Sequence, residues 1–179
     1  RRPPWWLRRT ALGLYNAGFR AAGRLRGCAL YHEPNHIPAP FAGPIVTTIH
    51  DLSVLRHPEW HPADRVRWYE CDLLPSLGRS CHFITVSEFS RQEMIELLDL
   101  DPERITAIPL GVRAIFHPRD PETIRPILAK HRLEPPYLLY TGTIEPRKNV
   151  PGLLTAYTGL DPGLRRRFPL VLAGVSGWG

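Results

Sequence analysis

The stretch 136-PYLLYTGTIEPRKNVPGLLTAYTGL-160 decides how this chain folds. It begins with the short apolar run 137–140, whose β-prone residues predict a buried strand. Small residues follow at positions 141–143, and Asn149 is then a good N-cap for a helix. Apolar residues recur at helical spacing beyond it, at Leu153, Leu154 and Tyr157. The stretch therefore predicts a strand, a loop and a helix.

Arg147 and Lys148 stand immediately before this predicted helix. Backbone N–H groups and the positive end of the helix dipole lie at such a helix start, and both attract anions. Two adjacent cations suit a diphosphate better than a single carboxylate. The alternative is that the pair is a solvated part of the loop. The sequence has no G-x-x-x-x-G-K-[ST] pattern, so we do not expect the phosphate loop of an NTPase.

The bulk composition is that of a globular protein. The chain has 179 residues, of which 43% are hydrophobic and 22% charged, and this length predicts one domain or slightly more. Three cysteines without C-x-x-C spacing disfavour a disulfide framework or a zinc site and fit a reducing cytosol. No apolar run approaches the length of a membrane span, and no signal peptide is recognisable.

The net charge of +6 comes from one segment. Seven of the 23 Lys and Arg residues lie within residues 1–26, which contain no acid, while the other 16 are balanced by all 17 acidic residues. This disfavours a general nucleic-acid surface. A helix is predicted after Pro4, and Trp5 and Trp6 stand at its start. Its apolar seam consists of Leu7, Ala11, Leu14, Gly18, Ala21 and Leu25.

Two interpretations of this basic helix remain open. A basic amphipathic helix with leading tryptophans suits an anionic membrane surface. In the other interpretation, which we favour from the sequence, the seam packs on a sheet and the arginines face water.

The motif His32-Glu33-Pro34-Asn35-His36 follows a short strand predicted at 29–31 and matches the metalloprotease pattern H-E-x-x-H. That chemistry requires both histidines on one face of a continuous helix. Pro34 within the motif makes such a helix improbable, so no zinc site is expected. A loop at the carboxyl end of a strand is the predicted setting.

A β-branched strand predicted at 44–49 ends in His50 and Asp51. In open parallel sheets, ligands bind beyond the carboxyl ends of the strands, which makes this pair a candidate site. The alternative is that Asp51 caps a turn and His50 merely packs. Ser87, after a strand predicted at 82–86, is interpreted as the N-cap of a helix that continues through Leu98.

Four motifs together resemble glycosyltransferase family 4, the retaining enzymes of the two-Rossmann-domain type that use nucleotide sugars. They are T-I-H-D-L-S at 48–53, T-V-S-E-F-S-R at 85–91, I-P-L-G-V at 108–112 and G-T-I-E-P-R-K-N at 142–149. The resemblance implies an α/β, GT-B-like fold with parts of two Rossmann-like domains and parallel sheets, both incomplete. Residues 1–112 would be a partial N-terminal, acceptor-side domain, and residues 113–179 the beginning of the nucleotide-sugar-binding domain. The chain would then be an interior fragment, inactive alone.

The resemblance also implies a function and a set of site residues. His50 would be catalytic, and the substrate-binding residues would be Asp51, Gly142, Thr143, Arg147 and Lys148. We expect a hexose to move with retention from a nucleotide diphosphate sugar to a glycan or lipid-linked acceptor, with no metal and no other cofactor. The H-E-P-N and P-E-W-H-P segments resemble mannosyltransferases of polysaccharide assembly, which favours GDP-mannose. The expected location is cytoplasmic, and in the membrane interpretation of residues 1–26 the protein would be peripheral at the inner face of the membrane. The alternative is a catalytically incomplete binding subunit or remnant.

Overall fold

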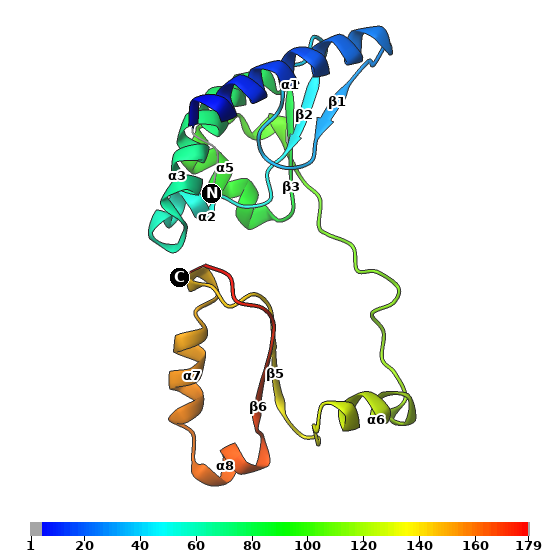
Figure 1. Ribbon diagram of the computed structural model, residues 1–179, viewed down its shortest axis with the longest axis vertical. Coiled ribbons are helices and arrows are strands. Elements are labelled where there is room, and N and C mark those ends of the chain that lie inside the picture. Colours follow the sequence, from blue (N-terminus) through cyan, green and yellow to red (C-terminus); the bar gives the residue numbers. More distant parts are fainter. Residues whose placement is uncertain (1–4, 179) are drawn as a thin grey trace. The chain divides into compact units, whose positions relative to one another are not determined.

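Strand β2 (Ile45–Thr48) lies within a four-stranded parallel sheet in this computed structural model, which describes residues 5–178 but not the side chains of residues 5, 6, 8 and 9. The strand order is β1-β2-β3-β4, and every neighbouring pair runs parallel. The other strands are β1 (Tyr31–Glu33), β3 (His82–Thr85) and β4 (Ile105–Ala107). The parallel arrangement confirms the predicted α/β class, and Figure 1 shows β1, β2 and β3 side by side.

Strand β1 lies two residues later than predicted. The ladder to β2 pairs Tyr31 with Ile45 and continues to Glu33 opposite Thr47, and the Tyr31 N–H donates to the Pro44 carbonyl at 3.0 Å. His32 and Glu33 are therefore strand residues and not part of the loop. The prediction at 29–31 was wrong because the register is set by pairing with β2, which local propensity does not specify.

Helical segments connect β2 to β3 and β3 to β4. After β2 come α2 (Ser53–Arg56), a 3-10 turn (Pro58–Trp60), α3 (Ala63–Trp68), a π-helical turn (Tyr69–Leu73), α4 (Leu74–Ser76) and a second 3-10 turn (Leu77–Arg79). After β3 come α5 (Glu88–Leu98) and a 3-10 turn (Pro102–Arg104). Since proline has no N–H and its ring clashes with the carbonyl four residues back, Pro75 favours the π-helical turn before it.

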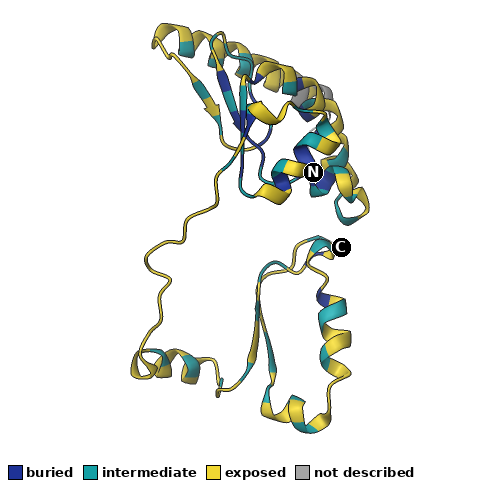
Figure 2. Cartoon of the chain, turned by 180° about the vertical axis from the view of Figure 1, so that it is seen from behind, coloured by how far each residue is buried: buried dark blue, intermediate teal, exposed yellow. Residues whose placement is uncertain are grey.

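The core of this unit gathers where these helices meet the sheet, and Figure 2 shows the buried residues concentrated there. It consists of Ile49, Leu52, Val54, Tyr69, Leu73, Phe83, Met94 and Ile105. Burial of apolar side chains of this size contributes roughly 1.5–3 kcal/mol each, so this cluster is the main source of the unit's stability.

Helix α1 (Trp5–Leu25) contacts the sheet by a different face from the one predicted. Phe19 packs on the Tyr31 ring at a centroid distance of 4.7 Å, and Gly23 lies against Phe41. The predicted seam stays exposed, with Leu14 at 73% and Leu25 at 88% relative exposure. The favoured sequence interpretation was therefore wrong for this seam, because the aromatic contacts of Phe19 select the packed face.

A second unit begins at Gly111, whereas the first reaches to Leu110. Residues 108–120 form neither helix nor strand. The second unit contains α6 (Pro121–Lys130), β5 (Leu138–Thr141), a 3-10 turn (Pro146–Lys148), α7 (Val150–Thr158), α8 (Pro162–Arg167) and β6 (Leu170–Ala173). Strands β5 and β6 pair in parallel, as in a βαβ unit.

The second unit has little buried surface of its own. Val150 and Glu145 are its buried residues within the described part of the chain, and β5 has none (Figure 2). The prediction of a buried strand at 137–140 was therefore right about the strand and wrong about its burial. A two-stranded sheet covered by short helices has too few neighbours to enclose its side chains.

Candidate active site

His50 and Asp51 lie just beyond the carboxyl end of β2, as the sequence predicted. Ile49 is fully buried and its N–H donates to the Ile84 carbonyl of β3 at 2.8 Å, which fixes the main chain one residue before His50. Asp51 Oδ1 accepts hydrogen bonds from the N–H of Ser53 at 2.9 Å and from its hydroxyl at 2.6 Å. Asp51 therefore caps the turn into α2, which was the structural alternative for this residue.

The imidazole of His50 has a defined tautomer. Its Nε2 lies 3.0 Å from the carbonyl oxygen of Pro34. A carbonyl oxygen only accepts, so Nε2 must donate, and Nδ1 of the neutral ring is left as an acceptor. His50 can thus accept a hydrogen bond through one nitrogen while the other is held by the protein.

A second element holds the main chain of His50. Ser90, on α5, donates from its hydroxyl to the His50 carbonyl oxygen at 3.3 Å. Helix α5 begins where the sequence predicted, since Ser87 is its N-cap and accepts from the Ser90 N–H at 3.1 Å. The structural interpretation of Ser87 is confirmed, and the capped turn brings Ser90 to the candidate site.

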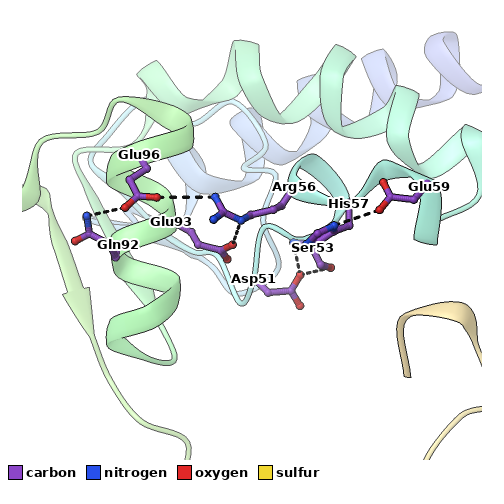
Figure 3. A network of polar contacts seen from close by, with 8 residues as sticks. All are labelled: Asp51, Ser53, Arg56, His57, Glu59, Gln92, Glu93 and Glu96. Carbon is purple, nitrogen blue, oxygen red and sulfur yellow. Dashed lines mark hydrogen bonds and ion pairs between the residues drawn. The ribbon is translucent and has the colours of Figure 1, made fainter. Parts of the chain in front are cut away.

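An ion pair joins α2, which follows the candidate site, to α5 (Figure 3). Arg56 Nε lies 3.4 Å from Glu93 Oε1, and Arg56 Nη1 lies 3.9 Å from Glu96 Oε2. The Glu93 side chain is only 9% exposed, so its charge depends on Arg56 for compensation. Because α2 follows His50 and Asp51 directly, this pair fixes the orientation of the segment that leaves the candidate site.

The motif His32–His36 does not form a zinc site. The two histidines have different partners, since His32 Nε2 contacts the Thr48 hydroxyl at 2.8 Å and His36 Nδ1 contacts the Tyr69 hydroxyl at 3.2 Å. Among residues 5–178, no group of three His, Cys, Asp or Glu side chains is arranged to hold a metal ion. The motif occupies β1 and the turn after it, as a proline-containing segment should.

In the second unit, the predicted substrate-binding residues lie along the turn from β5 to α7. Gly142 has φ 149°, a conformation that favours glycine, and its N–H donates to the Ala173 carbonyl at 3.0 Å. Thr143 accepts a hydrogen bond at its carbonyl from the Tyr140 hydroxyl at 3.0 Å. A Cβ at Gly174 would lie 1.9 Å from the Gly142 carbonyl, so the loops after β5 and β6 touch backbone to backbone.

Asn149 caps α7 as predicted, accepting at Oδ1 from the Gly152 N–H at 3.2 Å. Pro151, the second residue of the helix, has no N–H. With the Gly152 N–H bonded to Asn149 and no N–H at Pro151, neither position offers an N–H group to an anion, while the dipole is unchanged. Lys148 is exposed at this end of the helix.

Arg147 has a partner that the sequence analysis missed. Its Nη2 lies 2.7 Å and its Nε 3.1 Å from Oε1 of Glu145, whose side chain is 4% exposed. Glu145 was part of the motif considered, but nothing in a Glu-Pro-Arg spacing indicates that the carboxylate turns inward. The pair leaves Lys148 as the uncompensated charge among Glu145, Arg147 and Lys148.

The structure thus groups the predicted residues by unit. His50 and Asp51 lie together in the first unit, and Gly142, Thr143, Arg147 and Lys148 lie together in the second. Contacts of Pro34, His36 and Ser90 with His50 could not be read from sequence spacing, because they join segments far apart along the chain.

Comparisons with known proteins show the family of the chain. The model of Glycosyltransferase Family 4 matches residues 1–114. The O-antigen chain mannosyltransferase B of Escherichia coli is 43% identical over 150 residues, which cover 83% of this chain and 39% of that protein. The serotype-specific mannosyltransferase WbdA of Escherichia coli is 32% identical over 131 residues, or 72% of this chain and 16% of that protein. The chain therefore spans well under half the length of these relatives.

None of the helices in the described part of the chain has the length and apolar character needed to cross a membrane.

Proposed function

Because the chain belongs to glycosyltransferase family 4, we propose that it is part of an enzyme that transfers mannose from GDP-mannose to a glycan or lipid-linked saccharide, with retention of configuration. The names of two relatives describe mannosyltransferases, and one of these names refers to an O-antigen chain. The single observation that carries the proposal is the 43% identity to the first of these over most of this chain.

Lys148, the dipole of α7 and the Glu145-oriented guanidinium of Arg147 would hold the donor diphosphate. As the bond to the sugar breaks, negative charge grows on the diphosphate, and fixed positive groups stabilise it without reorganising. These groups make a metal unnecessary in the proposal, and Gly142 and Thr143 line the same turn. Exposed Lys148 contributes most, because the charge of Arg147 is balanced by Glu145.

His50 would bind the donor sugar by a hydrogen bond. Its Nε2 is engaged by the Pro34 carbonyl, so its Nδ1 is available to accept from a sugar hydroxyl. Asp51 is held by Ser53 beside it and would contribute a second acceptor for hydroxyl groups. The acceptor hydroxyl would attack from the face that the diphosphate leaves, which accounts for retention.

The exposed seam of α1 would face an anionic membrane surface, so the enzyme would lie at the inner face of the membrane. Leu14 and Leu25 are exposed on a helix whose charged residues are all arginine. Apolar side chains and arginines on one amphipathic helix match acyl chains and anionic headgroups together.

The test is transfer by the full natural polypeptide that contains this chain. Incubation with GDP-mannose and a lipid-linked acceptor should yield a mannosylated product with the anomeric configuration of the donor, unaffected by EDTA. Transfer from UDP-glucose but not from GDP-mannose would overturn the donor, and an inverted product would overturn retention. Binding of GDP without transfer to any acceptor would support the binding-subunit alternative instead.

A further inference from the structure

His36 is a buried histidine that the proposed mechanism does not use. It is 7% exposed, and its ring centroid lies 5.6 Å from that of His50. The backbone N–H of His36 donates to the carbonyl of Thr48, the last residue of β2, at 2.9 Å. The position of His36 is therefore fixed by β2, the strand that ends just before His50.

The backbone of His36 is in the left-handed region, with φ 71°. This conformation is uncommon outside glycine, and histidine adopts it, with asparagine and aspartate, more often than other residues do. The ring of His36 is held as well: Nδ1 contacts the Tyr69 hydroxyl at 3.2 Å, with the two rings 5.5 Å apart.

Tyr69 begins the π-helical turn and is itself buried. Burial, followed by the nearby charge of Asp51, raises the pKa of Tyr69 to about 12, so the phenol keeps its proton. Burial and then the charge of His50 lower the pKa of His36 to about 4, although the carboxylates of Asp51 and Glu33 act in the opposite direction. Both members of the pair are thus neutral near pH 7.

We infer that His36 and Tyr69 are positioning residues for His50: they hold the turn 34–36 so that the Pro34 carbonyl accepts the Nε2 proton of His50 and keeps Nδ1 as the acceptor. Pro34 is two residues before His36, so the orientation of this carbonyl depends on where the His36 ring is anchored. The consequence for transfer rests on the proposed function, but the tautomer itself does not.

The test is the tautomer of His50, measured from the ¹⁵N shifts of its imidazole in this chain. Tyr69→Phe removes the hydroxyl, and we expect the share of the Nε2-protonated form to fall by about fivefold relative to the other tautomer, the change expected for one buried hydrogen bond. Tyr15→Phe, at an exposed tyrosine of α1, is the matched control and should change nothing.

Two substitutions at His36 separate the ring from the backbone. Asparagine and glycine both tolerate a positive φ, but only asparagine places an acceptor, Oδ1, where Nδ1 stands. His36→Asn should therefore preserve the His50 tautomer and His36→Gly should not. If Tyr69→Phe and His36→Gly both leave the ¹⁵N shifts of His50 unchanged, the inference is overturned.

Transfer rates of the full polypeptide distinguish this inference from the proposed function. Tyr69→Phe and His36→Gly should lower kcat about fivefold, with KM for the donor nearly constant, and His36→Asn should restore kcat. A changed tautomer with an unchanged kcat would leave the positioning intact and refute the catalytic assignment of His50. A reduced kcat with an unchanged tautomer would refute the positioning alone.

Discussion

Arg147 places two nitrogens, Nη2 at 2.7 Å and Nε at 3.1 Å, on a single carboxylate oxygen of the buried Glu145. If Arg147 and Lys148 were the solvated loop pair that the sequence left open as an alternative, removing either would cost little stability. The ion pair changes this expectation for Arg147, because a buried carboxylate would lose its partner.

The first prediction concerns this pair. Arg147→Ala should destabilise the turn from β5 to α7 by about 2 kcal/mol, since Glu145 would be left buried and unpaired. Lys148→Ala should cost almost nothing, because Lys148 is exposed. Hydrogen exchange of the amides in residues 138–158 measures both. Equal protection in the two variants would contradict the structural importance of the pair.

The second prediction is a pH dependence of stability caused by His36. Its folded pKa of about 4 lies below its unfolded value, so the unfolded chain binds the extra proton between about pH 6.5 and pH 4. The stability that His36 contributes in its neutral form is fully present above pH 6.5. It is lost as the pH falls toward 4, by up to about 3 kcal/mol. Urea unfolding from pH 7 to pH 4 should show this loss.

His36→Asn is the control for that slope, because asparagine does not titrate and tolerates the backbone conformation. The unfolding free energy of wild type minus that of this variant should fall as the pH is lowered from 6.5 to 4, and it should stay constant above pH 6.5. Parallel curves over the whole range would show that His36 titrates normally.

The third prediction concerns the ion pair between Arg56 and Glu93. Arg56→Ala should lower the free energy of unfolding by about 1–2 kcal/mol, because the Glu93 side chain is 9% exposed. Arg125 pairs with Glu122, whose side chain is 79% exposed, so Arg125→Ala should cost less than about 0.5 kcal/mol. If denaturant titration gives both variants the same loss, Glu93 does not depend on Arg56.

The fourth prediction concerns the exposed seam of α1. Leu14→Glu with Leu25→Glu should weaken sedimentation with vesicles that contain anionic phospholipid by at least about tenfold, since it removes apolar contact and adds repulsion. Leu110→Glu with Val112→Glu changes two equally exposed residues outside the helix and should have little effect. Equal losses in both double variants would argue against α1 as the contact.

Much of the fold could be predicted from local patterns. The apolar run before Thr141 and the caps Ser87 and Asn149 specify strands and helix starts through neighbouring residues alone, and the structure has them where expected. The H-E-P-N-H segment was correctly kept out of a helix because one proline is sufficient to prevent it. Such features require no knowledge of distant parts of the chain.

The sequence predictions that were wrong concern features that depend on contacts between residues far apart along the chain. The register of β1 is set by Ile45, and the packed face of α1 by Tyr31 and Phe41. In the candidate site, His50 and Asp51 could be located by the rule for carboxyl ends of strands. The contacts of Pro34 and Ser90 with His50, and of Tyr69 with His36, could not. Periodicity describes one segment at a time and carries no information about which segment it will meet.

The most direct test of the central claim, that a nucleoside diphosphate binds at the turn before α7, is calorimetric titration of the full polypeptide with GDP and with guanosine. Lys148→Ala should weaken GDP binding at least about tenfold, the effect of one charge-assisted contact, and leave guanosine binding unchanged. Lys130→Ala, an exposed lysine at the end of α6, should alter neither affinity. If GDP binds wild type and Lys148→Ala equally well, the diphosphate is held elsewhere and the account is wrong.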